Sequence, residues 1–183
     1  MAEKIILGID PGTTVTGYGL IRGQGKRMEL LACGAITLGK QEVSHADKLA
    51  RIYRRVTGLV EEYQPQEVAL EAPFYGKNPQ SMLKLGRAQG VAMAAAINQG
   101  LPIFEYAPRK VKVAVTGNGA ASKEQVAAML RKLLKFEEEP QYLDATDGLA
   151  VAVCHFFQGD QPQVGSKAKG WADFVKKNPG RLK

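Results

Sequence analysis

Four carboxylate residues occupy positions at which a folded chain could gather them at one place. Asp10 follows the apolar run of residues 5–9 and precedes a Pro-Gly turn, which no central strand accommodates. Glu71 follows the short apolar run of residues 68–70 and precedes another proline turn. Ligands collect at the carboxyl ends of strands in α/β sheets, so both positions predict a shared role for these acids.

Asp144 and Asp147 form the second half of this pattern. They are three residues apart in a segment with helical spacing, so both project from one face, one turn apart. Four carboxylates brought together would repel by ~4 kcal/mol per close pair at an effective dielectric near 20, unless protons or cations are bound. All-oxygen ligation favours Mg²⁺ or Mn²⁺, and two such ions ~4 Å apart would support hydrolysis of a phosphodiester.

Each acid also has a simpler interpretation. Asp before Pro-Gly is a common turn residue, and Glu at a strand end is usually solvated. Asp144 and Asp147 would also suit the amino terminus of a helix. The joint arrangement favours a metal site, because the strand ends and the helix face converge only in one fold.

The elements that must position these acids follow from periodicity and turn residues. We expect strands at residues 5–9, 16–22, 28–38, 68–71 and 102–106, and helices at residues 44–63, 78–98, 122–134 and 143–157. The first three strands are joined by short Gly-rich connections, which indicates an antiparallel meander. The first helix then implies a right-handed crossover to a parallel fourth strand. The sequence therefore predicts an α/β protein with a five-stranded mixed sheet flanked by helices.

Composition indicates one basic domain and a tail. The 183 residues fall within the usual length of a single domain, and 45% hydrophobic residues provide a core. A net charge of +7 favours a polyanionic partner, although a merely basic soluble protein would look the same. Residues 159–183 carry six basic and two acidic side chains, so we expect a domain over residues 1–158 and a basic, flexible tail over residues 159–183.

Neither the cysteines nor the hydropathy indicate an extracellular or membrane setting. Cys33 and Cys154 lie in apolar stretches without metal-ligand spacing, so we expect buried thiols and no disulfide. No charged-then-apolar leader opens the printed sequence, and no apolar run approaches the ~18 residues that span a bilayer. We therefore expect a cytoplasmic protein without a membrane partner.

Several segments resemble, in order and spacing, the RuvC family of crossover junction endodeoxyribonucleases. The matching segments are residues 7–12, 16–19, 71–78, 83–90 and 144–150. The resemblance covers about residues 4–157 and implies an RNase H-like nuclease domain and a two-fold homodimer. It also implies that paired symmetric nicks resolve a Holliday junction, the four-way DNA junction of recombination and repair. Two Mg²⁺ ions per site, replaceable by Mn²⁺, and cooperation with the RuvA and RuvB branch-migration proteins are further implications.

Carried over residue by residue, the resemblance assigns metal binding and catalysis to Asp10, Glu71, Asp144 and Asp147. Phe74 matches an aromatic residue that stacks on a base at the opened crossover, and the alternative is a Phe folded back as a hydrophobic plug. Lys112 and Lys123 match lysines that contact phosphate, and the alternative is solvated surface charge. Further expected DNA contacts are Tyr75, Lys77, Lys84, Arg87, Arg109 and Lys110.

Three further features of the sequence do not involve the four acids. The helix expected at residues 78–98 is apolar and small on more than one side, which indicates either burial beneath the sheet or a symmetric partner helix. Pro108 precedes Arg109 where the family leads us to expect a smaller residue. His155 follows Asp147 by eight residues, roughly 12 Å along a helix, and we interpret it as an ordinary helix residue outside any shared metal site.

Three other functions compete with the junction nuclease. Residues 8–14 also resemble the phosphate loop of actin-like and Hsp70-like ATPases, but those need two lobes and a second phosphate motif. An RNase H-like nuclease of ribosomal RNA precursors would keep the fold and the metals, and residues 74–90 favour the junction enzyme instead. A junction protein that only binds would leave four acids without a role.

Overall fold

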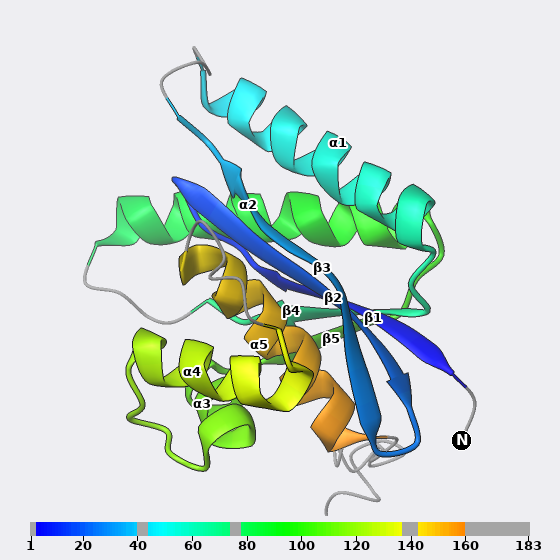
Figure 1. Cartoon of the computed structure of the whole chain (residues 1–183). Helices are drawn as coiled ribbons and strands as arrows, with labels where there is room; N and C mark the ends of the chain where they lie inside the picture. The colour runs from blue at the N-terminus through cyan, green and yellow to red at the C-terminus, as the bar shows by residue number, and fades with distance from the viewer. Residues whose placement is uncertain (1–2, 40–43, 74–77, 137–142, 160–183) are drawn as a thin grey trace, which may run out of the picture.

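The computed structural model describes residues 3–39, 44–73, 78–136 and 143–159, and Figure 1 shows the chain. The strands are β1 (Lys4–Asp10), β2 (Val15–Gln24), β3 (Arg27–Thr37), β4 (Glu67–Glu71) and β5 (Ile103–Tyr106). The helices are α1 (His45–Tyr63), α2 (Pro79–Asn98), α3 (Pro108–Thr116), α4 (Lys123–Leu134) and α5 (Leu143–Gln158).

The five strands form one mixed sheet with the order β3-β2-β1-β4-β5. Strands β1, β2 and β3 are antiparallel neighbours, whereas β4 pairs in parallel with β1 and β5 in parallel with β4. The meander, the crossover through α1 and the mixed sheet predicted from the sequence are therefore confirmed. Strand order changes direction at β1, which places the carboxyl end of β1 at a position where α/β sheets collect ligands.

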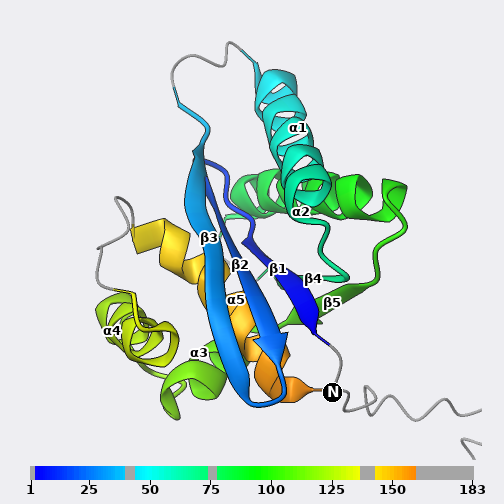
Figure 2. The same ribbon diagram turned by 45° about the vertical axis from the view of Figure 1, so that its right-hand side comes forward.

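Helices cover both faces of the sheet, as Figures 1 and 2 show from two directions. Helices α1 and α2 pack together over one face, and their core includes Leu7, Leu20 and Ile52. Helices α3, α4 and α5 cover the other face, with α5 against β1 and β2 and a core that includes Leu130 and Leu149. These two apolar layers fix the sheet between them, so the strand ends have a rigid support.

Local sequence signals set the helix ends. Ser44 and Ser122 each cap a helix, and each forms the reciprocal capping box predicted from its spacing to the acid or amide three residues later. Helix α3 was not predicted. It begins with Pro108 at its first turn and ends at Gly117, which has a φ of 76°. Pro108 is thus compatible with the helix because the first turn needs no backbone N–H donor there.

Two predictions about the thiols and the membrane are answered within the described chain. Both are free thiols; Cys154 is buried, as expected, whereas Cys33 is only half-buried. Among the described residues, no helix combines the length and apolar composition that crossing a membrane requires. The predicted basic tail comprises residues 159–183, and all of it after Gly159 lies outside the described residues.

Candidate active site

The carboxyl ends of β1 and β4 bring Asp10 and Glu71 side by side. Ile9 pairs with Leu70 in the parallel register, and each acid is the next residue of its strand. Alternation along β1 puts Asp10 on the same face as Gly8, whose Cα lies against Gly148 of α5. Alternation along β4 puts Glu71 on the face of Ala69, which belongs to the same core layer as α5. Both acids therefore face the layer that contains α5.

Close packing of α5 on β2 brings the second pair of acids to this edge. A Cβ on Gly17 would collide with the carbonyl oxygen of Asp144, and a Cβ on Gly148 would lie 2.5 Å from the backbone nitrogen of Tyr18. Only hydrogen atoms fit at these two positions, so helix and strand backbones are in direct contact. Because Gly17 pairs with Asp10 across β2 and β1, the start of α5 lies beside Asp10.

Lys123 neutralises the acids of α5. Its ammonium, on the first residue of α4, donates to Asp144 Oδ1 at 3.2 Å and to Asp147 Oδ2 at 2.6 Å. The side chain of Asp147 is 15% exposed and that of Asp144 is 41% exposed, so the contact between Lys123 and Asp147 lies in the drier environment. Burial opposes ionisation of the lysine, but these contacts raise the pKa of Lys123 above its ordinary value.

The pKa values of the acids indicate that they share one electrostatic environment. Burial, followed by the charge of Asp147, raises the pKa of Asp10 to about 7 against the lowering influence of Lys123. Burial, followed by the charges of Asp10 and Asp147, raises the pKa of Glu71 to about 8, with Lys112 opposing. Burial also raises the pKa of Asp147, and the hydrogen bond from Lys123 opposes it. Strongly perturbed carboxylates from three elements are typical of a catalytic or metal-binding centre.

These pKa values predict that the metal-free protein loses stability as the pH rises. A carboxyl whose folded pKa lies near 7 or 8 holds a proton that the unfolded chain releases near pH 4, so stability falls between these values. Asn in place of Asp10 should therefore raise the free energy of unfolding by about 4 kcal/mol at pH 8 and change it little at pH 4. Urea denaturation in EDTA measures this. A loss of stability at pH 8, or the same gain from the exposed control Glu61→Gln, would contradict it.

The donor chemistry of the site fits hard divalent cations. All four candidate ligands are carboxylates, the preferred ligands of Mg²⁺ and Mn²⁺, and their mutual repulsion is what a cation would relieve. In this conformation, no three Asp, Glu, His or Cys side chains of the described residues lie close enough together to hold one ion. Joint ligation of one ion by these carboxylates would therefore require their side chains to move.

A small pocket opens beside Asp10 and Glu71. Its volume is about 150 Å³, and Leu85 and Gln89 of α2 and Pro108 of α3 form much of its wall. Gln89 is buried, and its amide donates to Glu105 Oε1 at 2.6 Å, so its orientation is fixed. Gln89 was not predicted as a site residue, because its hydrogen-bond partner lies on another element.

The structure brings some of the expected DNA contacts to the acids and leaves others away from them. Lys112 lies half-buried on α3, close enough for its charge to lower the pKa of Glu71. Lys110 lies over the ring of Tyr106 at 5.1 Å. The remaining described candidates are exposed: Lys84, Arg87 and Arg109. Phe74, Tyr75 and Lys77 lie outside the described residues, and all DNA contacts remain predictions.

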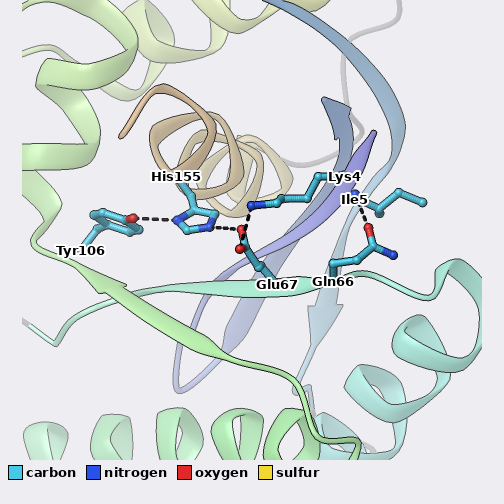
Figure 3. Close-up of polar contacts among 6 residues, drawn as sticks. All are labelled: Lys4, Ile5, Gln66, Glu67, Tyr106 and His155. Atoms are coloured by element: carbon cyan, nitrogen blue, oxygen red, sulfur yellow. Dashed lines mark hydrogen bonds and ion pairs between the residues drawn. The ribbon is translucent and has the colours of Figure 1, made fainter. Parts of the chain in front are cut away.

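A buried polar chain holds the far half of α5 (Figure 3). His155 is 5% exposed, and its Nδ1 lies 2.6 Å from the Tyr106 hydroxyl and its Nε2 2.7 Å from Glu67 Oε2. Lys4 donates to the other oxygen of Glu67 at 2.8 Å. Burial alone would raise the pKa of Glu67, but the bonds from Lys4 and His155 hold it below its ordinary value. His155 is therefore no ordinary helix residue: it links α5 to β1, β4 and β5.

The fold and the site together define an RNase H-like nuclease. The sheet has the order β3-β2-β1-β4-β5, and two of the acids lie at the ends of its adjacent parallel strands β1 and β4. The other two acids lie on α5, which packs against the same sheet. The sequence profile of the family described as "Crossover junction endodeoxyribonuclease RuvC" matches residues 6–155. The chain therefore belongs to the RuvC family of crossover junction endodeoxyribonucleases.

Individual relatives support this assignment over almost the whole chain. The RuvC of Bacteroides fragilis is 58% identical, with 99% of this chain and 97% of that protein aligned. The RuvC of Cytophaga hutchinsonii is 59% identical, with 99% of this chain and 89% of that protein aligned. The solved structure of Thermus thermophilus RuvC in complex with Holliday junction substrate is 34% identical, has a TM-score of 0.78 and covers 84% of this chain and 93% of that chain.

Proposed function

We propose that this protein resolves Holliday junctions in recombination and DNA repair by paired, symmetric nicks. The observation that carries the proposal is the convergence of four carboxylates from β1, β4 and α5 in a chain of this family. The Thermus thermophilus relative was solved with a Holliday junction substrate, which supports the same substrate here. Cleavage of a synthetic four-way junction, compared with a matched linear duplex, tests the proposal.

Asp10, Glu71, Asp144 and Asp147 would hold two Mg²⁺ ions, for which Mn²⁺ could substitute. Such ions, when bound, would activate a water molecule and stabilise the leaving oxygen of an in-line displacement. The perturbed pKa values of Asp10 and Glu71 support this assignment, because carboxylates held close together are poised for a cation. The Lys123 ammonium balances part of this charge until the acids take up their ligand.

The surrounding cations of the chain would orient the DNA. Lys112 on α3 and Lys123 at the first turn of α4 lie beside the acids, where a scissile phosphate would enter. Phe74 is the residue that we propose to stack on a base at the opened crossover, with Tyr75 and Lys77 nearby in sequence. Lys84, Arg87, Arg109 and Lys110 would contribute backbone contacts. RuvA and RuvB are the proposed branch-migration partners, and the cytoplasm is the proposed location.

Two nicks on opposite strands require two active sites, and we propose that α2 forms the two-fold interface. Leu83 is 60% exposed and Ile97 is 61% exposed, although both are large apolar residues. They lie fourteen residues apart along α2, with exposed Gly86, Gly90 and Ala94 between them on the same side. An apolar stripe with small central residues would let a symmetric copy of the helix approach closely.

Glu at Leu83 or Ile97 should therefore convert a dimer into a monomer. A buried, unpaired carboxylate in each copy would cost several kcal/mol, enough to dissociate an interface of this kind at micromolar concentration. Light scattering after size exclusion gives the mass directly, and Tyr53→Glu on α1 is the matched control. A monomeric parent protein would contradict the proposed dimer. Glu variants that keep the mass of a dimer would place the interface elsewhere.

A further inference from the structure

A basic pocket lies on the sheet face opposite to the acids of α5. It is a hollow of about 340 Å³ between the end of β3 and the first half of α1. Ala35 and Ile36 line it from β3, and Arg51, Arg54 and Arg55 line it from α1. Among the described residues, those that line this hollow include no acidic side chain, and we call it the arginine pocket.

The three arginines converge because of their helical spacing. Positions 51, 54 and 55 lie within one face of α1, away from the buried Ile52 and Val56. Residues 45–60 contain four basic side chains and one acid, Asp47, which is engaged in the capping box of the same helix. This part of α1 therefore carries an excess of basic side chains.

Arg55 is held in a fixed orientation. Its Nη2 donates to the hydroxyl of Tyr18 at 2.7 Å, and its guanidinium carbon lies 5.2 Å from the centre of the Tyr18 ring. A guanidinium fixed by stacking and a hydrogen bond loses less conformational entropy when it binds an anion. This pocket thus differs from a row of solvated arginines on a helix surface.

The pocket lies at the same end of the strands as Asp10. In the antiparallel registers, Asp10 pairs with Gly17 and Gly17 pairs with Ala35. Neighbouring strands are about 4.8 Å apart, so Ala35 lies about 10 Å from Asp10 along this edge. The pocket and the acids lie on opposite faces of the sheet, so a DNA strand would reach both by passing around this end of β2 and β3.

We propose that the arginine pocket binds the sugar–phosphate backbone of a junction arm next to the cleaved strand. The inference rests on the proposed function, and it adds a second phosphate-binding surface to the one formed by Lys112 and Lys123. Guanidinium groups present paired N–H donors that match phosphate oxygens, and several lie together here. Continuity with the edge that holds Asp10 favours DNA over an acidic segment of a protein.

The test compares two double variants that remove equal charge from opposite ends of the sheet. Arg51→Gln with Arg54→Gln removes two cations of the pocket and leaves the Arg55–Tyr18 contact intact. Lys26→Gln with Arg27→Gln removes two exposed cations at the β2–β3 turn, at the other end of the sheet. Junction binding is measured in EDTA by fluorescence anisotropy from low to high salt.

The pocket variant should reduce the slope of log K against log salt by about 1.8. At 0.1 M salt its Kd for the junction should rise roughly 60-fold, and this difference should shrink toward 1 M salt. The turn variant should keep the slope and the Kd of the parent. Lys at positions 51 and 54 should restore the slope, because the charge is retained; this variant also excludes misfolding as the cause.

An unchanged slope in the pocket variant, with the Lys variant and the parent binding normally, would overturn the inference. Equal losses in the pocket and turn variants would also overturn it, because only total charge would then matter. Both outcomes are separate from a failure of the proposed function, which would appear as a parent protein that does not nick four-way junctions in the presence of Mg²⁺.

Discussion

An Asp10→Asn variant is expected to bind four-way junctions and to leave them uncut. Asn keeps the size of the side chain but removes the charge that a cation at the end of β1 would need. Losing several kcal/mol of charge stabilisation in the transition state corresponds to a decrease of about a thousandfold in the rate of nicking. Single-turnover cleavage with excess protein measures the rate, and anisotropy in EDTA measures binding.

The same variant also gives a readout that does not depend on activity. Mg²⁺ should raise the thermal midpoint of the parent protein, because a ligand that binds only the folded state stabilises it. The Asp10→Asn protein should lose most of this response, whereas the exposed control Glu61→Gln should keep it. Undiminished cleavage and an unchanged Mg²⁺ response in Asp10→Asn would show that Asp10 is not part of the metal site.

Ala at Gly148 is expected to damage both folding and catalysis. Its Cβ would lie 2.5 Å from the backbone nitrogen of Tyr18, so α5 would have to move away from β2. Overpacking of this kind costs about 1–3 kcal/mol and more where only backbone can yield, so we expect a loss at or above that range. Because Asp147 is the preceding residue, the displacement should also slow nicking.

Gly58 of α1 provides the matched control for this substitution. No atom lies within 4 Å of the Cβ that Ala would add there, and the position is inside a helix. Gly58→Ala should therefore leave nicking unchanged and stabilise the protein by up to about 1 kcal/mol. Urea unfolding of both variants measures the contrast. A Gly148→Ala protein as stable and as active as the parent would show that the contact between α5 and β2 is not restrictive.

The sequence was sufficient to predict the sheet and the adjacent strand ends that carry Asp10 and Glu71. Turn residues after Asp10 and Glu71 fixed the strand ends, and the meander and crossover rules made those strands adjacent. Capping boxes located the starts of α1 and α4 because their partners are three residues apart. Each of these inferences depends on contacts that are local in the chain or on a general rule of topology.

Features that depend on distant partners could not be read from the sequence. Helix α3 is only nine residues long and starts with Pro108, so its periodicity was too short to recognise. The partners of His155 are 49 and 88 residues away, and the acids bound by Lys123 are 21 and 24 residues away. Such pairings arise because α5 packs closely on the sheet, and Gly17 and Gly148 permit this packing.

The most direct measurement is cleavage of an end-labelled four-way junction that contains many sequence contexts, beside a matched linear duplex, a structured RNA and ATP. Mg²⁺, Mn²⁺ and EDTA are compared, with Asp144→Asn as the variant of the site. We predict symmetric nicks in the junction alone, present with either metal, absent in EDTA and absent with Asp144→Asn although binding persists. An intact junction with both metals, or preferential cleavage of the RNA or hydrolysis of ATP, would contradict the account.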